Sequence, residues 1–598
     1  MTGKKNIGSL AIPWIPTVRP ENEESCYPYK KQVPSTNKLP PGWTFAPGRR
    51  PVDQTLIHEE CVAIPLRDGV QIQCDVFRPE TDEKLPALLA VSPYGKNGHG
   101  FRIFDNIPFR LGLPESATSG LEKFEGPDPV EWCPRGYVIV NVDIRGSWES
   151  EGDLYIEGSQ MGLDGYDTVQ FISTLPWCNG SVSMVGNSWL ATEQWATAIQ
   201  KPPALKCIAP WEAFTDKYRD LVCRGGIPKT NFASFIFNKT IRGRGNREDI
   251  SKALEQWPFM NAYWEDKIYD TSELTIPIYA LASYSSGNHG SGTVRGFNKA
   301  ASKDKWIRFH STQEWYDLYT QKYIDDLQKF FDRYLKDIKN DWEKTPKARV
   351  SILTYGNRNE PGPLEDIPFS EFPPVSIEYQ SLYLQKSGNL ARSKQADVES
   401  VKHVADSYQA KPSEFKFTFE KPTNVVGHSK AELWMSCDDL DDMDVFVSLR
   451  KISKEGKVLE HVNVPWHSLP EGVDTQDDVP MAQTVKYTGP TGILRASHRA
   501  QDPDKSTPMI PHHPHDGEDK VPAGEIVKLE IALWPMGIHF EAGESIMLRV
   551  QGFADQSTDF PSHVDMKLDN LNHGKHAIHF GGKYDSKVII PVVNVEGH

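Results

Sequence analysis

Short apolar runs alternate with helical segments between residues 85 and 211, and this alternation constrains the fold of the chain more than any other feature. The runs LPALLAVSPYG, YVIVNVDIRGS, VSMVG and LKCIAPW are typical of strands that are buried on both faces of a sheet. The segments DGYDTVQFISTL and WLATEQWATAI between them have helical character. This order predicts a parallel sheet with right-handed crossovers, to which IPIYALASY and KWIRFHS would add further strands.

The pattern changes after the amphipathic segment DDLQKFFDRYLK and a proline-rich stretch. Alternating strands such as KAELWMSC, DVFVSLRKI and SIMLRVQGF follow, with hardly any helix signal, and they predict an antiparallel β-sandwich. A chain of 598 residues is long enough for several domains. We expect an N-terminal arm (1–52), an α/β core (53–215 and 270–345) interrupted by a helical cap (216–269), a linker (346–375) and the sandwich (376–598). The arm is either draped over another domain or a mobile extension, and we favour the first because Trp14 and Trp43 would be costly to expose.

Composition narrows the class of protein. The 66 Lys and Arg against 81 Asp and Glu give a net charge of −15, which argues against nucleic acid and anionic membranes as partners. No apolar stretch approaches the roughly 18 residues of a membrane span, and the prolines near the N-terminus argue against a signal peptide. The eight cysteines form no CxxC pair, as expected for reduced thiols. We therefore expect a cytoplasmic enzyme that acts on a small molecule. Whether the chain forms a homo-oligomer stays open.

The strongest signal for chemistry is the segment GNSWLA (186–191) between the strand VSMV and a helix. In a nucleophile elbow the chain turns sharply from strand to helix, which holds a serine Oγ clear of the sheet and points the first helical N–H groups at the reacting carbonyl. Gly186 and Ala191 are small where backbones approach, although Leu190 takes the place of the second glycine of GxSxG. Ser188 is thus the candidate nucleophile, and its alternative role is that of an N-cap serine.

Several motifs occur together around this elbow: VNVDIRGSWESEGD, DGYDTVQFISTLPWCNG and SVSMVGNSWLATEQW. With PLRDGVQIQCDVFRP, SPYGK, GILRASHR and LEIALWPMGIHFEAGESIMLRV, they resemble the X-Pro dipeptidyl-peptidase and cocaine-esterase family of α/β-hydrolases, from about Glu60 to Val593. The resemblance implies an α/β-hydrolase core with a helical cap and a C-terminal jelly-roll sandwich. It also implies that Asp143 and Arg145 form a structural turn that braces the elbow.

The resemblance further implies an oxyanion hole with two donors. One is the backbone N–H of Trp189, and the other is the hydroxyl of Tyr94, which matches the tyrosine of the family's Pro-Tyr-Gly loop. Alternatively, Tyr94 is a core tyrosine whose hydroxyl forms its hydrogen bond with another group of the protein.

The rest of the triad departs from the family pattern. The family acid follows the next-to-last core strand in a Gly-Trp-Tyr-Asp context, but here that strand ends in ALASYSSGNHGSG, with no Asp or Glu between Ala280 and Gly296. The family histidine follows the last strand in a Pro-Trp-x-His-Gly context, whereas this chain has WIRFHSTQEWYDLY. Gln313 or Glu314 occupies the place of that histidine, and His310 lies three or four residues earlier.

Three arrangements stay open, because a serine needs a base and the base needs an orienting partner, whatever the chain order. In the first, which we favour, positions are exchanged: His289 is the base and Glu314 is its carboxylate. In the second, His310 is the base and the acid follows the previous strand, as Glu212 or Asp216. In the third there is no functional triad.

Two polar loops contain ligand-type residues without ligand spacing, and we read both as solvated loops rather than metal sites. They are the run Asp438–Asp444 and the segment with His512, His513, His515 and Asp516. No glycine-rich phosphate or dinucleotide motif stands between a strand and a helix, so we predict no organic cofactor.

The sequence therefore predicts a serine hydrolase that cleaves an ester or amide bond of a small molecule through an acyl-enzyme on Ser188. Tryptophans next to the elbow are candidates for an aromatic acyl pocket, although most tryptophans should be core residues. The rival prediction is an enzyme of secondary metabolism that uses the same pocket for acyl transfer, cyclisation, elimination or isomerisation. A non-catalytic binding protein is a third, less favoured alternative.

Overall fold

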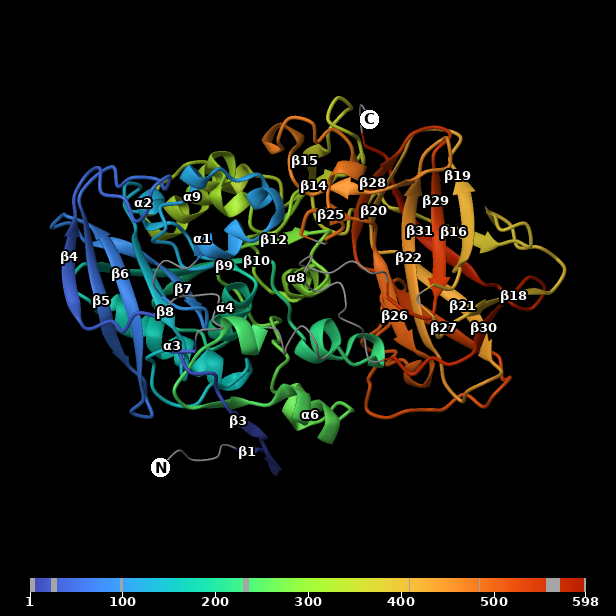
Figure 1. Ribbon diagram of the computed structural model, residues 1–598, viewed down its shortest axis with the longest axis horizontal. Helices are drawn as coiled ribbons and strands as arrows, with labels where there is room; N and C mark the ends of the chain where they lie inside the picture. The colour runs from blue at the N-terminus through green and yellow to red at the C-terminus, as the bar shows by residue number, and fades with distance from the viewer. Residues whose placement is uncertain are drawn as a thin grey trace.

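The structure is a computed structural model that describes residues 6–22, 29–96, 100–229, 236–407, 409–482, 484–554 and 570–595. An α/β half and an all-β half lie side by side (Figure 1). Cys26 lies outside the described residues, and the cysteines within them are all buried and free. No described helix combines the length and the apolar character that a membrane span requires.

The α/β half is built on an 11-stranded sheet with the order β15-β14-β13-β12-β10-β9-β7-β8-β6-β5-β4. The strands from β14 to β8 in this order run parallel, and a turn at Asp68-Gly69 joins the antiparallel pair β5 and β6. β8 and β12 are buried along their whole length, as their continuous apolar sequences predict. The bounds are Ser35–Leu39 (β4), Leu56–Pro65 (β5), Gln71–Pro79 (β6), Leu85–Ser92 (β7), Val138–Asp143 (β8), Cys178–Asn187 (β9), Leu205–Trp211 (β10), Ile278–Ser283 (β12), Lys305–His310 (β13), Ala348–Ile352 (β14) and Leu364–Phe369 (β15).

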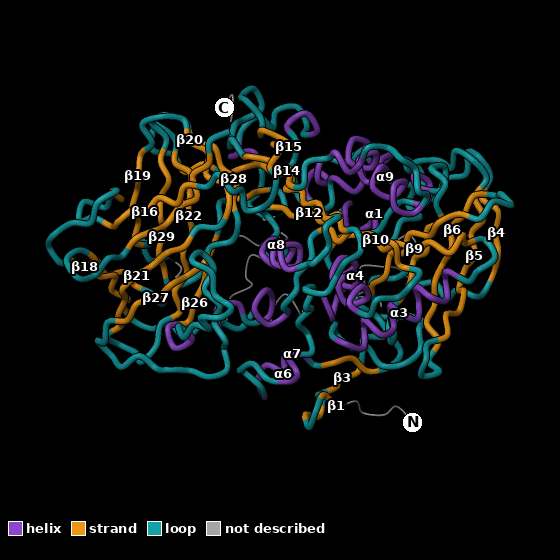
Figure 2. The backbone as a smooth tube through the Cα atoms, turned by 180° about the vertical axis from the view of Figure 1, so that it is seen from behind, coloured by secondary structure: helices purple, strands orange, loops and turns teal. Residues whose placement is uncertain are grey.

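Helices cover both faces of this sheet. α3 and α4 pack together on one face, and α9 lies on the other (Figures 1 and 2). α9 buries Ile324, Leu327 and Phe331, as its amphipathic sequence predicts. The carboxyl ends of the parallel strands meet at one edge, which is where open α/β sheets place their ligand sites. The bounds are Gly100–Asp105 (α1), Pro129–Trp132 (α2), Ser159–Ser173 (α3), Trp189–Ile199 (α4), Gly290–Lys299 (α8), Gln321–Leu335 (α9), Pro108–Gly112 (η1), Glu115–Ala117 (η2), Asp317–Tyr319 (η6) and Trp342–Lys344 (η7).

The structure differs from the sequence prediction at both edges of the sheet. The segment 346–375, predicted as a linker, contains β14 and β15, which extend the sheet beyond β13. Its prolines suggested a linker, but Pro368 lies in the edge strand β15, where proline is tolerated. In the segment 1–52, predicted as an arm, β4 forms the opposite edge. Edge strands are largely exposed, so their apolar pattern is weak.

The segment 216–269, predicted as a helical cap, contains short helices and one strand in its described residues, 216–229 and 236–269. That strand, β11, pairs with β3 of the N-terminal arm, where Trp14 packs edge-on against Tyr155 with ring centroids 5.1 Å apart. The arm is therefore anchored on the cap segment through β3 and on the core through the side chain of Trp14. The bounds are Asn6–Ile7 (β1), Leu10–Ala11 (β2), Trp14–Pro16 (β3), Tyr218–Val222 (η3), Arg224–Gly226 (η4), Ile236–Thr240 (η5), Asn246–Glu248 (β11), Ile250–Gln256 (α6) and Ala262–Glu265 (α7).

The C-terminal half is an all-β domain of antiparallel strands in a 9-stranded, a 5-stranded and a 2-stranded sheet, as the alternating pattern predicts. The cap segment contacts this domain, since Arg219 donates hydrogen bonds to the carbonyls of His513 and Pro514. The bounds are Glu378–Leu384 (β16), Leu390–Ala391 (β17), Glu399–Val404 (β18), Ser413–Thr418 (β19), Thr423–Gly427 (β20), Lys430–Cys437 (β21), Asp444–Ile452 (β22), Val458–Leu459 (β23), His461–Val462 (β24), Lys486–Tyr487 (β25), Thr491–Arg495 (β26), Val527–Ala532 (β27), Met536–Phe540 (β28), Ser545–Gln551 (β29), Lys575–Phe580 (β30), Lys587–Val593 (β31), Trp466–Ser468 (η8), Gln476–Asp478 (η9) and Ala496–His498 (η10).

Candidate active site

β9 and α4 form a sharp strand-to-helix turn at Ser188. The strand ends at Asn187 and the helix begins at Trp189, so Ser188 alone joins them, with φ 58° and ψ −118°. This backbone conformation is strained for a residue with a side chain. The Ser188 N–H donates to the carbonyls of Trp211 at 3.2 Å and Glu212 at 3.0 Å. Ser188 stands at the N-cap position of α4, but its side chain forms no capping hydrogen bond. The geometry is thus that of an elbow rather than of an N-cap serine.

His289 lies at the end of the loop that follows β12, directly before α8. Its Nε2 atom is 3.3 Å from Ser188 Oγ, and its Nδ1 atom is 3.0 Å from a carboxylate oxygen of Glu314 and 2.8 Å from Ser286 Oγ. When Nδ1 carries the proton and donates a hydrogen bond to Glu314, the lone pair of Nε2 faces Ser188. The imidazole is buried and stacks on Phe214, with the ring planes 6° apart.

Glu314 lies in the loop that follows β13, and this loop is tied to the elbow. The side-chain amide of Asn187 donates to the backbone carbonyl of Glu314, and Gln313 accepts the N–H of Trp315 at 2.9 Å. Glu314 is buried. The structure therefore brings together the residues of the exchanged arrangement, with the histidine from the loop after β12 and the acid from the loop after β13.

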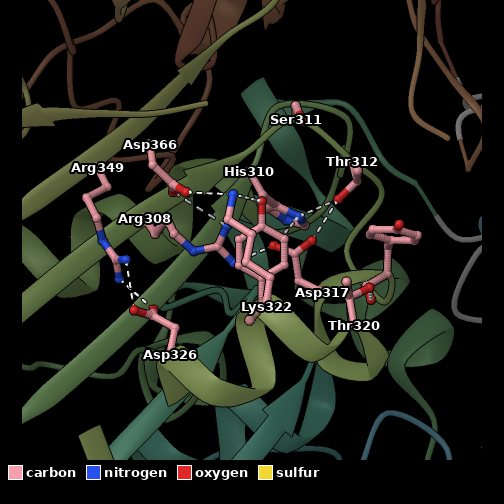
Figure 3. Close-up of polar contacts among 12 residues, drawn as sticks. Arg308, His310, Ser311, Thr312, Asp317, Thr320, Lys322, Asp326, Arg349 and Asp366 are labelled. Atoms are coloured by element: carbon pink, nitrogen blue, oxygen red, sulfur yellow. Dashed lines mark hydrogen bonds and ion pairs between the residues drawn. The ribbon is translucent and has the colours of Figure 1, made fainter. Parts of the chain in front are cut away.

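His310 and Glu212 form a second histidine–carboxylate pair, 2.8 Å apart and fully buried. Figure 3 shows His310 in one polar network with Arg308, Thr312 and Asp317. Burial lowers the pKa of His310, but Asp317 and Glu212 outweigh this effect and raise the pKa to about 9. His310 is therefore a cation at neutral pH and is poorly suited to accept a proton.

The contacts in the described chain thus distinguish between the triad arrangements that the sequence left open. Ser188 Oγ reaches His289 rather than His310. Asp216, the other candidate acid, forms an ion pair with Arg219 at 2.7 Å. Arg145 binds Asp164 of α3 at 2.7 Å, so the turn with Asp143 braces the helix before the elbow strand.

The two residues that the resemblance implies for an oxyanion hole lie next to each other. The rings of Tyr94 and Trp189 meet edge to face with centroids 6.2 Å apart, and both side chains are buried. Trp189 is the first residue of α4, where N–H groups have no acceptor within the helix. Tyr94 also packs edge-on against Phe124 at 5.4 Å, so its ring has a packing role in addition to any role in binding.

Glu125 belongs to this site, although no motif in the sequence pointed to it. Its carbonyl accepts the N–H of Asn187 at 3.1 Å, and its Oε1 atom accepts the indole N–H of Trp315 at 3.0 Å. Burial first, and the carboxylate of Glu314 second, raise the pKa of Glu125 well above its usual value. The surrounding segment KFEGPDP matches no catalytic motif, so only the fold reveals this neighbour.

Two groups of ligand-type side chains come close enough to hold a metal ion: Glu212, His289 and Glu314, and His58, Glu60 and Asp75. In the first group, two of the ligand atoms already hydrogen-bond each other in the triad-like contact. In the second, the ammonium group of Lys96 lies 2.6 Å from Asp75 and supplies a positive charge. Within the described chain, the loops 438–444 and 512–516 contribute no such group.

Comparisons with known proteins agree with this architecture. The family model of the X-Pro dipeptidyl-peptidase (S15 family) matches residues 68–240, and the model of the X-Pro dipeptidyl-peptidase C-terminal non-catalytic domain matches residues 340–589. The cocaine esterase of Rhodococcus sp. (strain MB1 Bresler) is 34% identical over 158 residues, which are 26% of this chain and 24% of that protein. The match thus spans about a quarter of this curated relative.

Solved structures resemble nearly the whole chain. A CocE/NonD family hydrolase from Staphylococcus aureus is 32% identical, with a TM-score of 0.81 over 90% of this chain and 94% of that one. An aminopeptidase from the marine sediment archaeon Thaumarchaeota archaeon shares the fold, with 16% identity and a TM-score of 0.65 over 90% of this chain and 97% of that one. The chain therefore belongs to the X-Pro dipeptidyl-peptidase and cocaine esterase family of α/β-hydrolases.

Proposed function

We propose that this protein is a serine hydrolase that cleaves an ester or amide bond of a small molecule through an acyl-enzyme on Ser188. The observation that carries the proposal is the line of contacts from Ser188 Oγ to His289 Nε2 at 3.3 Å and from His289 Nδ1 to Glu314 at 3.0 Å. A serine, a base and an orienting acid in this order are the machinery of acyl transfer on several unrelated folds. The name of the Rhodococcus relative, an esterase, supports the same reaction class.

Acylation and deacylation use the same three side chains. Ser188 Oγ attacks the carbonyl carbon while its proton passes to His289 Nε2, and Glu314 stabilises the resulting imidazolium through Nδ1–H. His289 then gives the proton to the leaving alcohol or amine, and the acyl group stays on Ser188. Water repeats the sequence: His289 takes a proton from the water, the oxygen attacks the acyl carbon, and Ser188 recovers its proton as the acid departs.

In this proposal, Tyr94 and the backbone N–H of Trp189 hold the tetrahedral oxyanion. They fit this role because they adjoin the elbow from two different elements, the loop after β7 and the start of α4. Fixed donors of this kind lower the barrier by roughly 2.7–4 kcal/mol each, because they need no reorganisation when the charge develops.

The aromatic surroundings of the nucleophile favour a substrate with an apolar acyl group. Tyr94, Trp189 and Phe214 are buried around Ser188 and His289. Such walls exclude water and leave the polar groups to orient the reacting carbonyl. The lysine ammonium near these rings, Lys217, is held 2.6 Å from Glu157 and is thereby neutralised.

The rival prediction, a non-hydrolytic enzyme of secondary metabolism, was motivated by the missing family acid and the displaced family histidine. Since Glu314 lies in contact with His289, that motive for the rival is weakened, and no observation in the described chain favours it over hydrolysis.

A fluorophosphonate probe tests the proposal without knowledge of the substrate. The intact mass of the protein should rise by one phosphonyl adduct, and Ser188→Ala should lose the adduct. Ser286→Ala is the matched control, because Ser286 also lies beside His289 but does not attack, and this variant should still be labelled. A natural protein that takes up no probe would refute the serine mechanism.

A further inference from the structure

We infer that Lys123 is a positioning residue for the oxyanion hole: its buried ammonium group fixes the backbone of the loop that carries Tyr94 and thereby sets the place of the Tyr94 hydroxyl. The inference rests on the proposed function, in which that hydroxyl is one of two oxyanion donors. It extends the proposal to a side chain outside the triad and the oxyanion hole. Like Glu125, Lys123 lies in the segment KFEGPDP, which matches no catalytic motif.

The first support is the pair of contacts that the Lys123 side chain makes. Its Nζ atom donates to the backbone carbonyl of Gly95, the residue after Tyr94, at 3.0 Å. The same atom donates to a carboxylate oxygen of Asp143, the last residue of β8, also at 3.0 Å. The side chains of Lys123 and Asp143 are both buried. The ammonium group therefore joins the loop after β7 to the carboxyl end of the neighbouring strand β8.

The second support is the set of contacts that the next two residues make. The ring of Phe124 packs edge-on against the ring of Tyr94, with centroids 5.4 Å apart. The carbonyl of Glu125 accepts the N–H of Asn187, the residue before the nucleophile, at 3.1 Å. Three successive residues, 123–125, thus contact the backbone of the Tyr94 loop, the ring of Tyr94 and the elbow. This segment links the two elements that supply the proposed oxyanion donors.

Other buried donors hold the rest of the Tyr94 loop. The indole N–H of Trp148 donates to the carbonyl of Pro93 at 2.9 Å, and the ammonium group of Lys96 lies 2.6 Å from a carboxylate oxygen of Asp75. The side chains of Trp148, Lys96 and Asp75 are all buried. The residues on either side of Tyr94 therefore each have their carbonyl fixed by a side chain from outside the loop, which restricts rotation of the backbone at Tyr94.

The fixed geometry gives a stronger reason for a buried lysine at this place than stability does. A buried ion pair adds little net stability, because the loss of hydration offsets the attraction between the charges. An oxyanion donor is effective only when its position is set before the charge develops, and a misplacement of about 1 Å can lower a rate about 100-fold. Without the ammonium group, the carbonyl of Gly95 would lose this donor, and the Tyr94 hydroxyl would move relative to the N–H of Trp189.

A double-mutant cycle on the fluorophosphonate labelling rate tests the inference. Lys123→Met removes the ammonium group but keeps most of the length of the side chain, and it should slow labelling by about 10- to 100-fold. In a Tyr94→Phe background, the same substitution should change the rate by less than about twofold, because the hydroxyl that Lys123 positions is already absent. A role in stability alone would not give this dependence on Tyr94, since a general loss of structure slows labelling in both backgrounds.

Lys267→Met is the matched control. Lys267, in the cap segment, is also a fully buried lysine whose ammonium group donates to a carboxylate and to a backbone carbonyl. These acceptors are Glu248 at 2.7 Å and Ile156 at 2.8 Å. Lys267→Met should lower the free energy of unfolding but leave the labelling rate within about twofold of its starting value in both backgrounds.

The outcomes separate this inference from the proposed function. A natural protein that is not labelled contradicts the serine mechanism, and a Tyr94→Phe variant that reacts at the natural rate contradicts the oxyanion role of Tyr94. An unchanged rate in Lys123→Met, an equal loss in both backgrounds, or a loss in Lys267→Met that also depends on Tyr94 overturns the role of Lys123 alone. If Lys123→Met does not fold, as judged by circular dichroism, Lys123→Met combined with Asp143→Asn takes its place, because this combination leaves no unpaired carboxylate, and the same results decide.

Discussion

At the scale of single residues, Glu314 carries the largest share of the proposed chemistry after the serine and the histidine. Glu314→Gln should lower the labelling rate by roughly 10³–10⁴-fold, because an amide favours the wrong tautomer of His289 and leaves its imidazolium unpaired. The matched control is Glu212→Gln, since Glu212 is also a buried glutamate next to a histidine but pairs with His310. Equal losses in the two variants would contradict the assignment of Glu314.

Tyr94 gives a second prediction at this scale. Tyr94→Phe keeps the ring that packs on Phe124 and Trp189 but removes the hydroxyl donor. Turnover of an ester substrate should fall by about 10²–10³-fold, with little change in the melting temperature. Tyr166→Phe, on α3, serves as the control and should leave turnover intact. If Tyr94→Phe lowered stability but not turnover, Tyr94 would be a core tyrosine only.

The sequence was informative about residues that lie next to recognisable strand ends. The proximity of Ser188, His289 and Glu314 could be predicted because each follows a strand whose carboxyl end points to the same edge of the sheet. Glu125 could not be predicted, since a segment with no helical or strand pattern brings it to the elbow through contacts that are remote in sequence. The charge on His310 was also hidden, because it depends on Asp317 and Glu212 folding around it.

At the scale of elements, the elbow depends on a glycine before the serine. Gly186 has φ 128°, and a Cβ atom there would lie 2.6 Å from the carbonyl oxygen of Glu125 and 2.6 Å from the side chain of Leu190. Gly186→Ala should therefore destabilise the protein by about 2 kcal/mol or more and slow labelling. Urea unfolding measures the first effect.

The matched control is Gly180→Ala in the same strand. Gly180 also has a positive φ, 89°, but a Cβ atom there meets nothing within 4 Å. In this variant the free energy of unfolding should fall by only about 1 kcal/mol, because the positive φ is unfavourable for alanine but nothing clashes, and the labelling rate should not change. Equal destabilisation in both variants would mean that the contact between Glu125 and the elbow is unimportant.

The elements that could be predicted were those with a strong apolar period. The parallel strands of the core, α3, α4 and α9 and the alternating strands of the C-terminal domain follow directly from such patterns. β14 and β15 were assigned to a linker because prolines lie in and around them, and β4 was missed because most of it is exposed. The short helices of the cap segment reflect tertiary contacts, such as the pairing of β11 with β3, that have no local signature.

At the scale of the whole molecule, buried histidines make stability depend on pH. Burial lowers the pKa of His403 and His428 to about 4 and that of His576 to about 3. The unfolded chain takes up these protons near pH 6.5 while the folded chain does not, so the free energy of unfolding falls as the pH drops from 6.5 toward 4. His310 acts in the opposite sense: its contribution is complete below pH 6.5 and is lost as the pH rises through about 9.

His576 is the best position at which to test how a buried histidine makes stability depend on pH. Neither of its ring nitrogens has a hydrogen-bond partner in the described chain, so burial acts there without a polar partner. His576→Leu should make the decline of unfolding free energy between pH 6.5 and 4 shallower by up to about 1.4 kcal/mol per pH unit. Urea titrations at several pH values measure the slope. His573→Leu, at a side chain that is 74% exposed, should leave the slope unchanged. An unchanged slope in His576→Leu would contradict the pKa assigned to this residue.

The central claim concerns two histidines, His289 in the loop after β12 and His310 at the end of β13, and the labelling rates of His289→Ala and His310→Gln test it most directly. The exchanged arrangement predicts that His289→Ala loses about 10³-fold or more in rate, while His310→Gln, if folded, stays within about tenfold of the natural protein. If His289→Ala kept its full rate and His310→Gln lost it, the base would be His310 and the exchanged arrangement would be wrong.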